Sequence, residues 1–368
     1  MTIQLCSLYS RGVANRNIDS LSAWPRLGPR PSSRKRVTRN DVAARARVSP
    51  STVSYVINNG PRPVSASARE RVLEAISELS YHPSEVARSL RTRQTRTIGL
   101  VIPDIANPFY GEVARAVEEV SSEQGYTVIL GHSNHLPERE LRCAQVLRSK
   151  QVDGVILHPV TPDLEPVYFL RQAGIQVVIL ERIVPGYHCI VADDQRGGYL
   201  ATRHLLELGH RRVGCVVRAE DPTSSIARVE GYRAALADMG LPVDKRLIVE
   251  SEFGFDGGEQ AAREFLNLPK RPTAVVTHND IIAIGVVKAL AEAGLRVPGD
   301  ISLVGFDDIA LASFVQPPLT TVFYPKHQMG RTAAELLLRL LTHEEVGPPK
   351  TTALPVHLVV RGSTAPPR

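Results

Sequence analysis

The chain has 368 residues, which is too long for one ordinary core and predicts two or three domains. Hydrophobic residues make up 43% of it and charged residues 22%, as in soluble globular proteins. No apolar run reaches the roughly eighteen residues that a membrane-spanning helix needs, so we expect no membrane span.

Charge is distributed unevenly along the chain. Residues 1–96 hold 17 Lys and Arg against 6 Asp and Glu, and the remainder holds 27 against 32, so the two parts carry +11 and −5. Polyanion affinity comes largely from Lys and Arg displacing counterions. The basic N-terminal quarter therefore indicates a tethered phosphate-binding module, with a solvated basic tail as the alternative.

The four cysteines are isolated from one another, at Cys6, Cys143, Cys189 and Cys215. They form no C-x-x-C motif and have no histidine at ligand spacing, so we expect neither a zinc site nor a disulfide framework. They are typical of reduced thiols in a cytoplasmic protein that needs no metal or other cofactor.

Residues 1–36 are rich in Ser, Arg and Pro and lack the apolar core of a secretory signal. We expect a disordered basic arm. Three short helices follow, over residues 41–46, 51–58 and 65–79. Thr38 with Asp41 forms a capping box for the first, Ser49 with Pro50 starts the second, and Ser65 starts the third. Apolar side chains on these helices predict a small core in a headpiece at residues 37–82, made of Val42, Ala46, Val53, Ile57, Val72, Ile76 and Leu79.

Residues 83–96 form the next segment, a short helix at 84–90 and a polar, arginine-rich linker. A helix of this length is unstable alone, so we expect a hinge that orders only with a partner.

From residue 97 to 361, apolar runs alternate with amphipathic helices. The predicted strands lie at residues 98–102, 127–130, 154–157, 176–180, 212–217, 273–277 and 301–305. This βαβ rhythm predicts two doubly wound parallel-sheet lobes with a ligand site in the cleft between them. Residues 362–368 have no heptad pattern, so we expect a flexible tail and no tetramerising zipper.

Several motifs resemble the lactose-repressor (LacI/GalR) family over residues 37 to about 361. They are VTRNDVA at 37–43, VSPSTVSYVIN at 48–58, LSYHP at 79–83, ARSL at 87–90, NPFY at 107–110, VDG at 152–154, GHRR at 209–212 and VGFDD at 304–308. The resemblance implies a homodimeric repressor with a helix-turn-helix headpiece and a periplasmic-binding-protein-like core. Its second headpiece helix would read operator DNA in the major groove.

The same resemblance supplies candidate DNA contacts. They are Thr38, Ser49, Ser51, Thr52, Tyr55, Asn58, Arg88, Leu90 and Arg91. Leu90 matches the family's minor-groove wedge, which would unstack the central base step. The alternatives are that Thr52 and Ser54 only cap and pack, and that Leu90 closes a helix stripe.

Effector contacts are carried over in the same way. They are Asn107, Phe109, Tyr110, Asp193, Arg228, Phe253 and Asp280. A guanidinium and a carboxylate across an aromatic-lined cleft suit a neutral polyhydroxy ligand, so we expect a sugar or related metabolite, with a purine or nucleoside as the alternative. Asp280 could instead be a helix N-cap, and Arg228 could form a surface salt bridge.

Two residues depart from the family pattern. Arg47 stands in the turn between the first two helices, where many members have Gly or Asn, and a left-handed conformation there costs about 1 kcal/mol. Pro50 occupies a position where some members place a base-reading side chain. The operator preference of a relative therefore does not transfer to this chain.

Other function classes have less support. A periplasmic-type solute-binding protein would share the lobes but have no use for residues 37–96. An enzyme would need a motif such as G-x-S-x-G, H-E-x-x-H or a Walker glycine loop, and none occurs. We interpret Asp307 and Asp308 as a strand end and a turn cap rather than an acid or metal pair.

Overall fold

A computed structural model describes residues 37–58, 60, 62–82, 94–160, 163–218 and 222–368. The chain divides into two compact units, Met1–Glu85 and Val86–Arg368, each of which is described by itself. The predicted arm at 1–36 and residues 83–93 of the predicted hinge lie outside the described residues.

The first unit contains the three predicted helices, α1 (Arg39–Ala46), α2 (Pro50–Asn58) and α3 (Ala66–Glu78). The Thr38–Asp41 capping box is confirmed, and Ser65 caps α3 through the amide of Ala68. Residues with side chains buried in this core are Val42, Ala43, Ala46, Val53, Val56, Val72 and Ala75. Ile57, Ile76 and Leu79, which were expected in the core, are only partly buried against it, because Val56 and Ala75 occupy the inner face of their helices.

Arg47 ends α1 in the left-handed conformation, with φ 52° and ψ 49°. Its amide donates to the carbonyls of Ala43 and Ala44, which satisfies the last turn of the helix. The backbone strain predicted from the sequence is therefore present.

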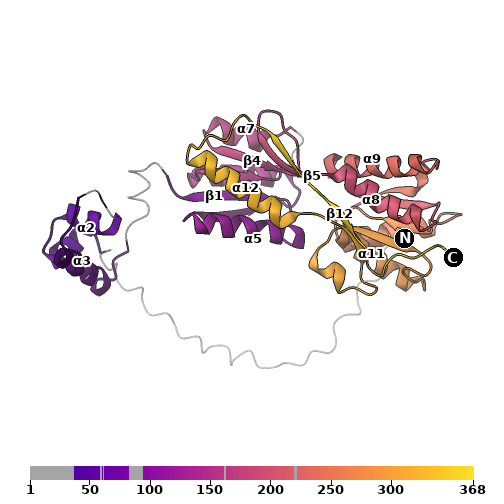
Figure 1. Cartoon of the computed structure of the whole chain (residues 1–368), viewed down its shortest axis with the longest axis horizontal. Coiled ribbons are helices and arrows are strands. Elements are labelled where there is room, and N and C mark those ends of the chain that lie inside the picture. The colour runs from indigo at the N-terminus through magenta and orange to yellow at the C-terminus, as the bar shows by residue number, and fades with distance from the viewer. Residues whose placement is uncertain (1–36, 59, 61, 83–93, 161–162, 219–221) are drawn as a thin grey trace, which may run out of the picture. The chain divides into compact units, whose positions relative to one another are not determined.

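The second unit contains two lobes. The sheet of lobe 1 has the order β11-β5-β4-β3-β1-β2, and all its pairings are parallel. Its strands are β1 (Thr97–Ile102), β2 (Thr127–His132), β3 (Gly154–Leu157), β4 (Gln176–Leu180), β5 (His188–Ala192) and β11 (Thr351–Leu354). The sheet is covered by α5 (Pro108–Glu123), α6 (Pro137–Ser149), α7 (Glu165–Gln172) and α12 (Lys326–Leu341) (Figure 1).

The sheet of lobe 2 repeats this plan in the order β12-β10-β9-β8-β6-β7. Its strands are β6 (Val213–Arg218), β7 (Ile248–Ser251), β8 (Ala274–Val276), β9 (Ser302–Asp307), β10 (Thr320–Phe323) and β12 (His357–Val359). Its helices are α8 (Asp194–Glu207), α9 (Pro222–Asp238), α10 (Phe255–Leu266) and α11 (Asp280–Glu292), with short 3-10 turns at Lys245–Leu247 and Ala310–Ser313. The predicted doubly wound lobes are confirmed, with one correction: the edge strand β12 is antiparallel.

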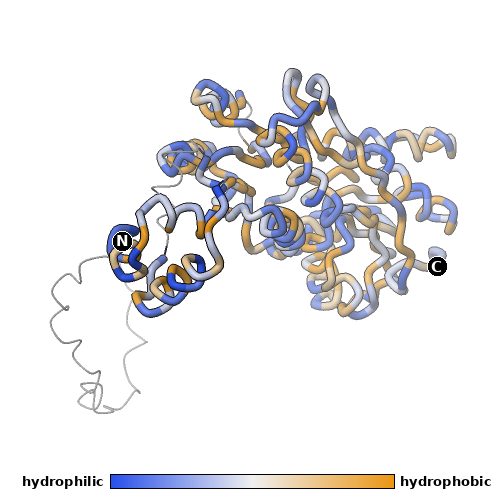
Figure 2. Tube along the Cα trace, turned by 60° about the vertical axis from the view of Figure 1, so that its left-hand side comes forward, coloured by the Kyte–Doolittle hydropathy of each residue, from blue (hydrophilic) through white to orange (hydrophobic). Residues whose placement is uncertain are grey.

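Hydropathy explains how the layers pack. The central strands β3 and β6 are buried along their whole length, whereas the helices present one apolar face to a sheet. Along the tube of Figure 2, hydrophobic and hydrophilic stretches alternate in the helices accordingly. Among the described residues, no helix is both long and apolar enough to cross a membrane.

The C-terminal segment 362–368 is not the flexible tail that the sequence suggested. The Ser363 side chain is fully buried; its hydroxyl donates to the carbonyl of Leu303 (2.6 Å) and accepts from the amide of Thr320 (2.8 Å). The carbonyl of Ala365 lies 2.9 Å from Nε2 of His210. The segment is therefore held against lobe 2 by long-range hydrogen bonds, which no local pattern reveals.

Candidate functional site

In the headpiece, the candidate DNA contacts cluster around the start and one face of α2. Ser51 and Asn58 are exposed, and Thr52 and Tyr55 are half-buried. The Ser49 hydroxyl accepts from the amide of Thr52 (3.1 Å), which confirms it as the cap of α2. The exposed positions recur along the helix, so α2 presents a polar face able to contact base edges and phosphates.

Some of these side chains already have local partners. The Ser49 hydroxyl lies 2.9 Å from that of Ser51 and 2.8 Å from that of Thr52, and Asn58 donates to the carbonyl of Ser54 (2.9 Å). The Thr38 hydroxyl donates to Asp41 (2.7 Å). Capping therefore accounts for part of this pattern, and DNA contacts would reuse the same exposed hydroxyl groups.

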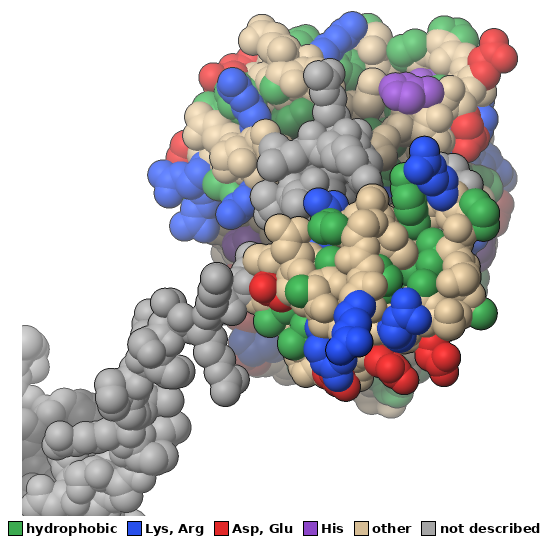
Figure 3. Space-filling view, turned by 90° about the vertical axis from the view of Figure 1, so that its left-hand side faces the viewer, with side chains coloured by type: hydrophobic (Ala, Val, Ile, Leu, Met, Phe, Trp, Pro, Cys, Tyr) green, Lys and Arg blue, Asp and Glu red, His purple; other side chains and the backbone are tan. Residues whose placement is uncertain are grey.

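The three remaining candidates, Arg88, Leu90 and Arg91, lie outside the described residues. Much of the positive charge of residues 1–96 also lies outside the described residues, because residues 37–82 contain only six Arg against four Asp and Glu. On the face of the molecule shown in Figure 3, blue basic side chains lie close to red acidic ones.

In the second unit, the sheet order locates the ligand site. Both lobes have their first strand between the second and third, so the connections after β1 and β3 leave on opposite faces, as do those after β6 and β8. Open parallel sheets bind ligands beyond the carboxyl ends of strands at such a switch point. Residues that follow these strands are therefore candidates for contacts with an effector.

On the lobe 1 side, Asn107 caps α5 by accepting from the amide of Phe109 (3.0 Å). Phe109 is buried and packs edge to face against Tyr110 and Tyr324, with centroid distances of 5.0 and 5.3 Å. The Tyr110 hydroxyl lies 3.1 Å from Nδ1 of His158, which follows β3. These residues form the lobe 1 wall of the candidate site, and His158 is a member of this cluster that was not predicted.

Arg228 is the centre of the lobe 2 side. Its Nε and Nη2 each lie 2.8 Å from Oδ1 of Asp194, and Nη1 donates to the carbonyl of His278 (2.5 Å). Its guanidinium lies 3.7 Å from the centroid of Phe306. The surface salt bridge considered from the sequence is wrong, because both charged side chains are buried.

Asp193 and Asp194 have different roles. Asp193 is an exposed N-cap of α8 that accepts from the amide of Arg196 (2.9 Å), whereas Asp194 is buried against Arg228. The sequence predicted Asp193 as an effector contact and did not identify Asp194. Adjacent positions at a helix start point in different directions, so sequence spacing alone could not choose between them.

Close packing of α8 on α9 aligns this ion pair. A Cβ on Gly198 would lie 2.2 Å from the carbonyl oxygen of Arg228, and one on Gly231 would lie 2.0 Å from that of Gln195. Only glycine allows the backbones to approach so closely. The glycine pair at 197–198 therefore has a packing role.

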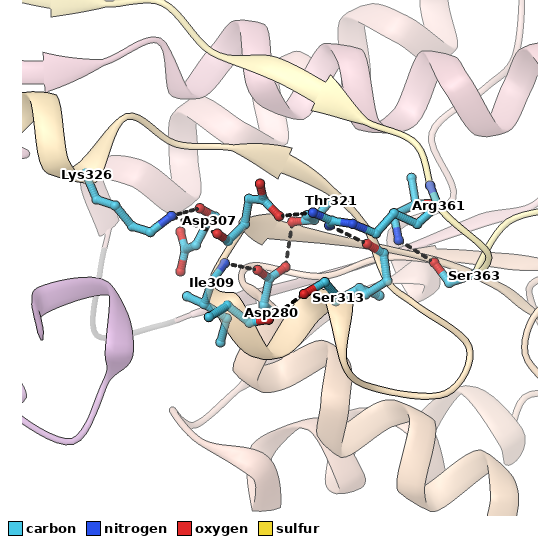
Figure 4. Close-up of polar contacts among 12 residues, drawn as sticks. Asp280, Asp307, Ile309, Ser313, Thr321, Lys326, Arg361 and Ser363 are labelled. Carbon is cyan, nitrogen blue, oxygen red and sulfur yellow. Dashed lines mark hydrogen bonds and ion pairs between the residues drawn. The ribbon is translucent and has the colours of Figure 1, made fainter. Parts of the chain in front are cut away.

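Asp280 lies behind the site rather than on its rim. Its side chain is 0% exposed; it accepts from the Thr321 hydroxyl (2.5 Å) and the amide of Ile309 (2.9 Å) (Figure 4). Asn279, not Asp280, is the N-cap of α11. Burial raises the pKa of Asp280 well above its usual value, and the neighbouring Asp307 raises it further. Asp280 therefore anchors the turn after β9. It is buried rather than exposed to an effector, and it is not the helix N-cap, so the structure corrects both roles that the sequence suggested.

The carboxylate that the sequence analysis set aside, Asp307, ends β9 beside this cluster. Burial raises its pKa to about 7, and the positive charges of Arg228 and Lys326 oppose that shift. Its φ is 106°, an uncommon conformation for a residue with a side chain. Its position at the carboxyl end of a central strand was the signal that could have identified it.

Phe253 provides the aromatic surface expected at this edge. The Arg218 guanidinium lies 4.9 Å from the centroid of the Phe253 ring. The ring of His135, which belongs to lobe 1, has its centroid 5.7 Å from that of Phe253. Arg218 is the last residue of β6 and was also not predicted. Donors on Arg218 and Arg228, an acceptor on Asp307 and aromatic faces suit a ligand with many hydroxyl groups. Within the described residues, no three His, Cys, Asp or Glu side chains gather as metal ligands.

Comparison with known proteins agrees with this architecture. Residues 38–84 match the model of the lacI family of bacterial regulatory proteins, and residues 202–364 match a periplasmic binding protein-like domain. The ribose operon repressor of Escherichia coli K12 is 40% identical over 329 residues, covering 89% of this chain and 99% of the repressor. The regulator GalR of the same strain is 38% identical over 333 residues, covering 90% of this chain and 96% of GalR.

Solved structures are similar over most of the chain. A lac repressor dimer bound to operator and the anti-inducer ONPF has a TM-score of 0.81 at 29% identity, covering 90% of this chain and all of that one (100%). A LacI family regulator from Enterococcus faecium with bound ribose has a TM-score of 0.66 at 33% identity, covering 74% and 100%. The family models, the near full-length relatives and the two-unit architecture together show that this chain belongs to the lacI family of bacterial regulatory proteins.

Proposed function

We propose that this protein is a homodimeric, cytoplasmic transcriptional repressor whose affinity for a pseudo-palindromic operator is controlled by a sugar bound between its two lobes. The headpiece spans residues 37–82, the hinge 83–96 and the effector-binding core 97–361. The single observation that carries the proposal is the presence, on one chain, of a headpiece with a polar α2 face and a core with polar and aromatic side chains at the switch point of each lobe.

Operator recognition is assigned to α2 and the hinge. Ser51, Thr52 and Tyr55 would contact the major groove, and Leu90 would enter the minor groove as a wedge. Leu90→Ala should weaken operator binding far more than binding to random DNA. Leu73→Ala, which truncates an exposed leucine of α3, is the matched control and should change neither. Equal losses on both DNAs for Leu90→Ala would contradict the wedge.

The effector site is assigned to Arg228, Arg218, Asp307 and Phe253, backed by Tyr110 and His158. Two relatives favour a sugar: the names of the ribose operon repressor and of the ribose-bound Enterococcus faecium regulator both refer to ribose. A purine or nucleoside is the second candidate, because a repressor named PurR from Vibrio atlanticus is 38% identical over 312 residues, covering 84% of this chain and 93% of PurR.

The test is to select binding sites for the full-length protein from random double-stranded DNA. Fluorescence anisotropy on the selected site then measures affinity with and without D-ribose, D-galactose, cellobiose and hypoxanthine. We expect a palindromic site whose affinity changes with one sugar. Sugar binding without any selected DNA would instead indicate a solute-binding protein.

The anisotropy measurement gives the sign of the response, because the two ligands affect each other's binding reciprocally. An inducer must bind the free protein more tightly than the operator complex, and a corepressor must do the reverse. Turnover of any of these compounds by the purified protein would overturn the assignment as a regulator without enzymatic activity.

A further inference from the structure

Lys326 occupies a buried position at the start of a helix, where a positive charge is destabilising. Its side chain is 3% exposed, and it is the first residue of α12, where the helix dipole opposes a positive charge. A buried ammonium needs several compensating acceptors to remain charged. The contacts of this group should therefore show what the position does.

Its ammonium contacts the turn that carries the candidate effector carboxylate. Nζ donates to the carbonyl of Asp307 (3.0 Å) and to that of Asp308 (2.7 Å) (Figure 4). These two consecutive residues have φ values of 106° and 53°, both in the region that side chains disfavour. Lys326 thus satisfies the two carbonyls that this conformation turns toward it, and so helps to hold the turn in place.

The same ammonium also reaches lobe 1. Its Nζ lies 3.7 Å from Oε1 of Glu112, in the first turns of α5. That helix begins at the wall residues Phe109 and Tyr110 and runs beside α12 (Figure 1). One charged group therefore contacts the effector-site turn of lobe 2 and the effector-site helix of lobe 1.

A second cation, Arg361, holds the same turn through contacts within lobe 2. Arg361 donates from Nη2 to Oδ1 of Asp308 (2.7 Å) and from Nη1 to the carbonyl of Leu319 (2.9 Å), both in lobe 2. It provides an internal control: both cations steady the turn, but among the contacts found for them only that of Lys326 reaches α5.

We propose that Lys326 is a positioning residue that couples the Asp307–Asp308 turn of lobe 2 to α5 of lobe 1. The proposal rests on the proposed effector site and adds a route between its two halves. When a ligand engages Asp307, the turn moves or stiffens, and the ammonium transmits that change to Glu112. Lobe closure and the state of α5 then become one equilibrium, which both sides of the site bias.

Hydrogen exchange of the ligand-free, full-length protein tests this link, read by mass spectrometry in peptides covering residues 303–312 and 109–119. Lys326→Met keeps the apolar stem and removes the ammonium, so exchange should accelerate roughly tenfold or more in both peptides. Arg361→Met loosens the turn but keeps the link, so it should accelerate exchange strongly in the first peptide and more weakly in the second. Glu112→Gln should accelerate it in the second only.

Two outcomes would overturn the proposal: wild-type exchange of α5 in Lys326→Met, or equal acceleration of α5 in Arg361→Met. If Lys326→Met does not fold, Glu112→Gln decides, because this side chain is 36% exposed and glutamine has nearly the same shape. Unchanged exchange of α5 in that variant would then reject the link.

A second arm adds D-ribose and separates this inference from the proposed function. In the wild type, D-ribose should slow exchange in both peptides, and in Glu112→Gln it should slow exchange at residues 303–312 only. If it slows neither in the wild type, ribose is rejected as the effector, and the ligand-free comparison still decides the role of Lys326. Full protection of α5 in Glu112→Gln would contradict the coupling.

Discussion

Replacing Asp194 by Ala would leave the Arg228 guanidinium buried without its counter-ion. The two side chains are only 10% and 11% exposed, and both guanidinium contacts to the carboxylate are 2.8 Å long. Removing one partner of such a buried pair costs about 3–5 kcal/mol, because the other charge remains desolvated. We therefore expect Asp194→Ala to lose about 3–5 kcal/mol of core stability.

The assay is urea unfolding of the full chain, followed by far-UV circular dichroism, which reports mainly on the large core. The double variant Asp194→Leu, Arg228→Met should recover most of the loss, since it buries no unpaired charge. Glu207→Ala, which breaks the exposed pair with Arg203, is the control and should cost less than about 1 kcal/mol. A loss for Asp194→Ala as small as that of the control would refute the reasoning and show that Arg228 is well solvated.

Three further predictions follow from local geometry. Arg47→Gly should stabilise the headpiece by about 1 kcal/mol, because glycine adopts the left-handed conformation without strain; an unchanged urea midpoint for the headpiece transition would contradict this. Ser363→Ala should lower core stability by about 1–3 kcal/mol, since the buried amide of Thr320 loses its acceptor; calorimetry showing an unchanged melting temperature would restore the flexible tail. Burial lowers the pKa of His204 and His210, so they favour the neutral form when folded, and their contribution to stability is lost as pH falls below their unfolded value of about 6.5. The double variant with glutamine at both positions should therefore lose less melting temperature than the wild type between about pH 7.5 and 5.5, and equal losses would argue against these two groups.

Features encoded over a few neighbouring residues were predictable from the sequence. The Thr38–Asp41 capping box, the Ser65 cap and the left-handed Arg47 depend on hydrogen bonds and sterics within one turn. Seven strands were predicted from their apolar runs; six of them lie inside a sheet, and the seventh, β2, forms an edge of the lobe 1 sheet. The short strands β7, β10, β11 and β12 were missed; each is three or four residues long, and three of them, β7, β11 and β12, form sheet edges. The five-residue strand β5 was also missed.

Only the tertiary structure decided the structural role of each carboxylate. Asp193, Asp194, Asp280 and Asp307 all lie near strand ends in the sequence, yet one is an exposed cap, one pairs with Arg228, one is buried behind the site and one ends β9 beside the cluster. Docking of Ser363 into lobe 2 is equally invisible in the sequence. The physical reason is that local structure follows from local sterics and hydrogen bonds, whereas the direction and burial of a side chain depend on segments that only folding brings together.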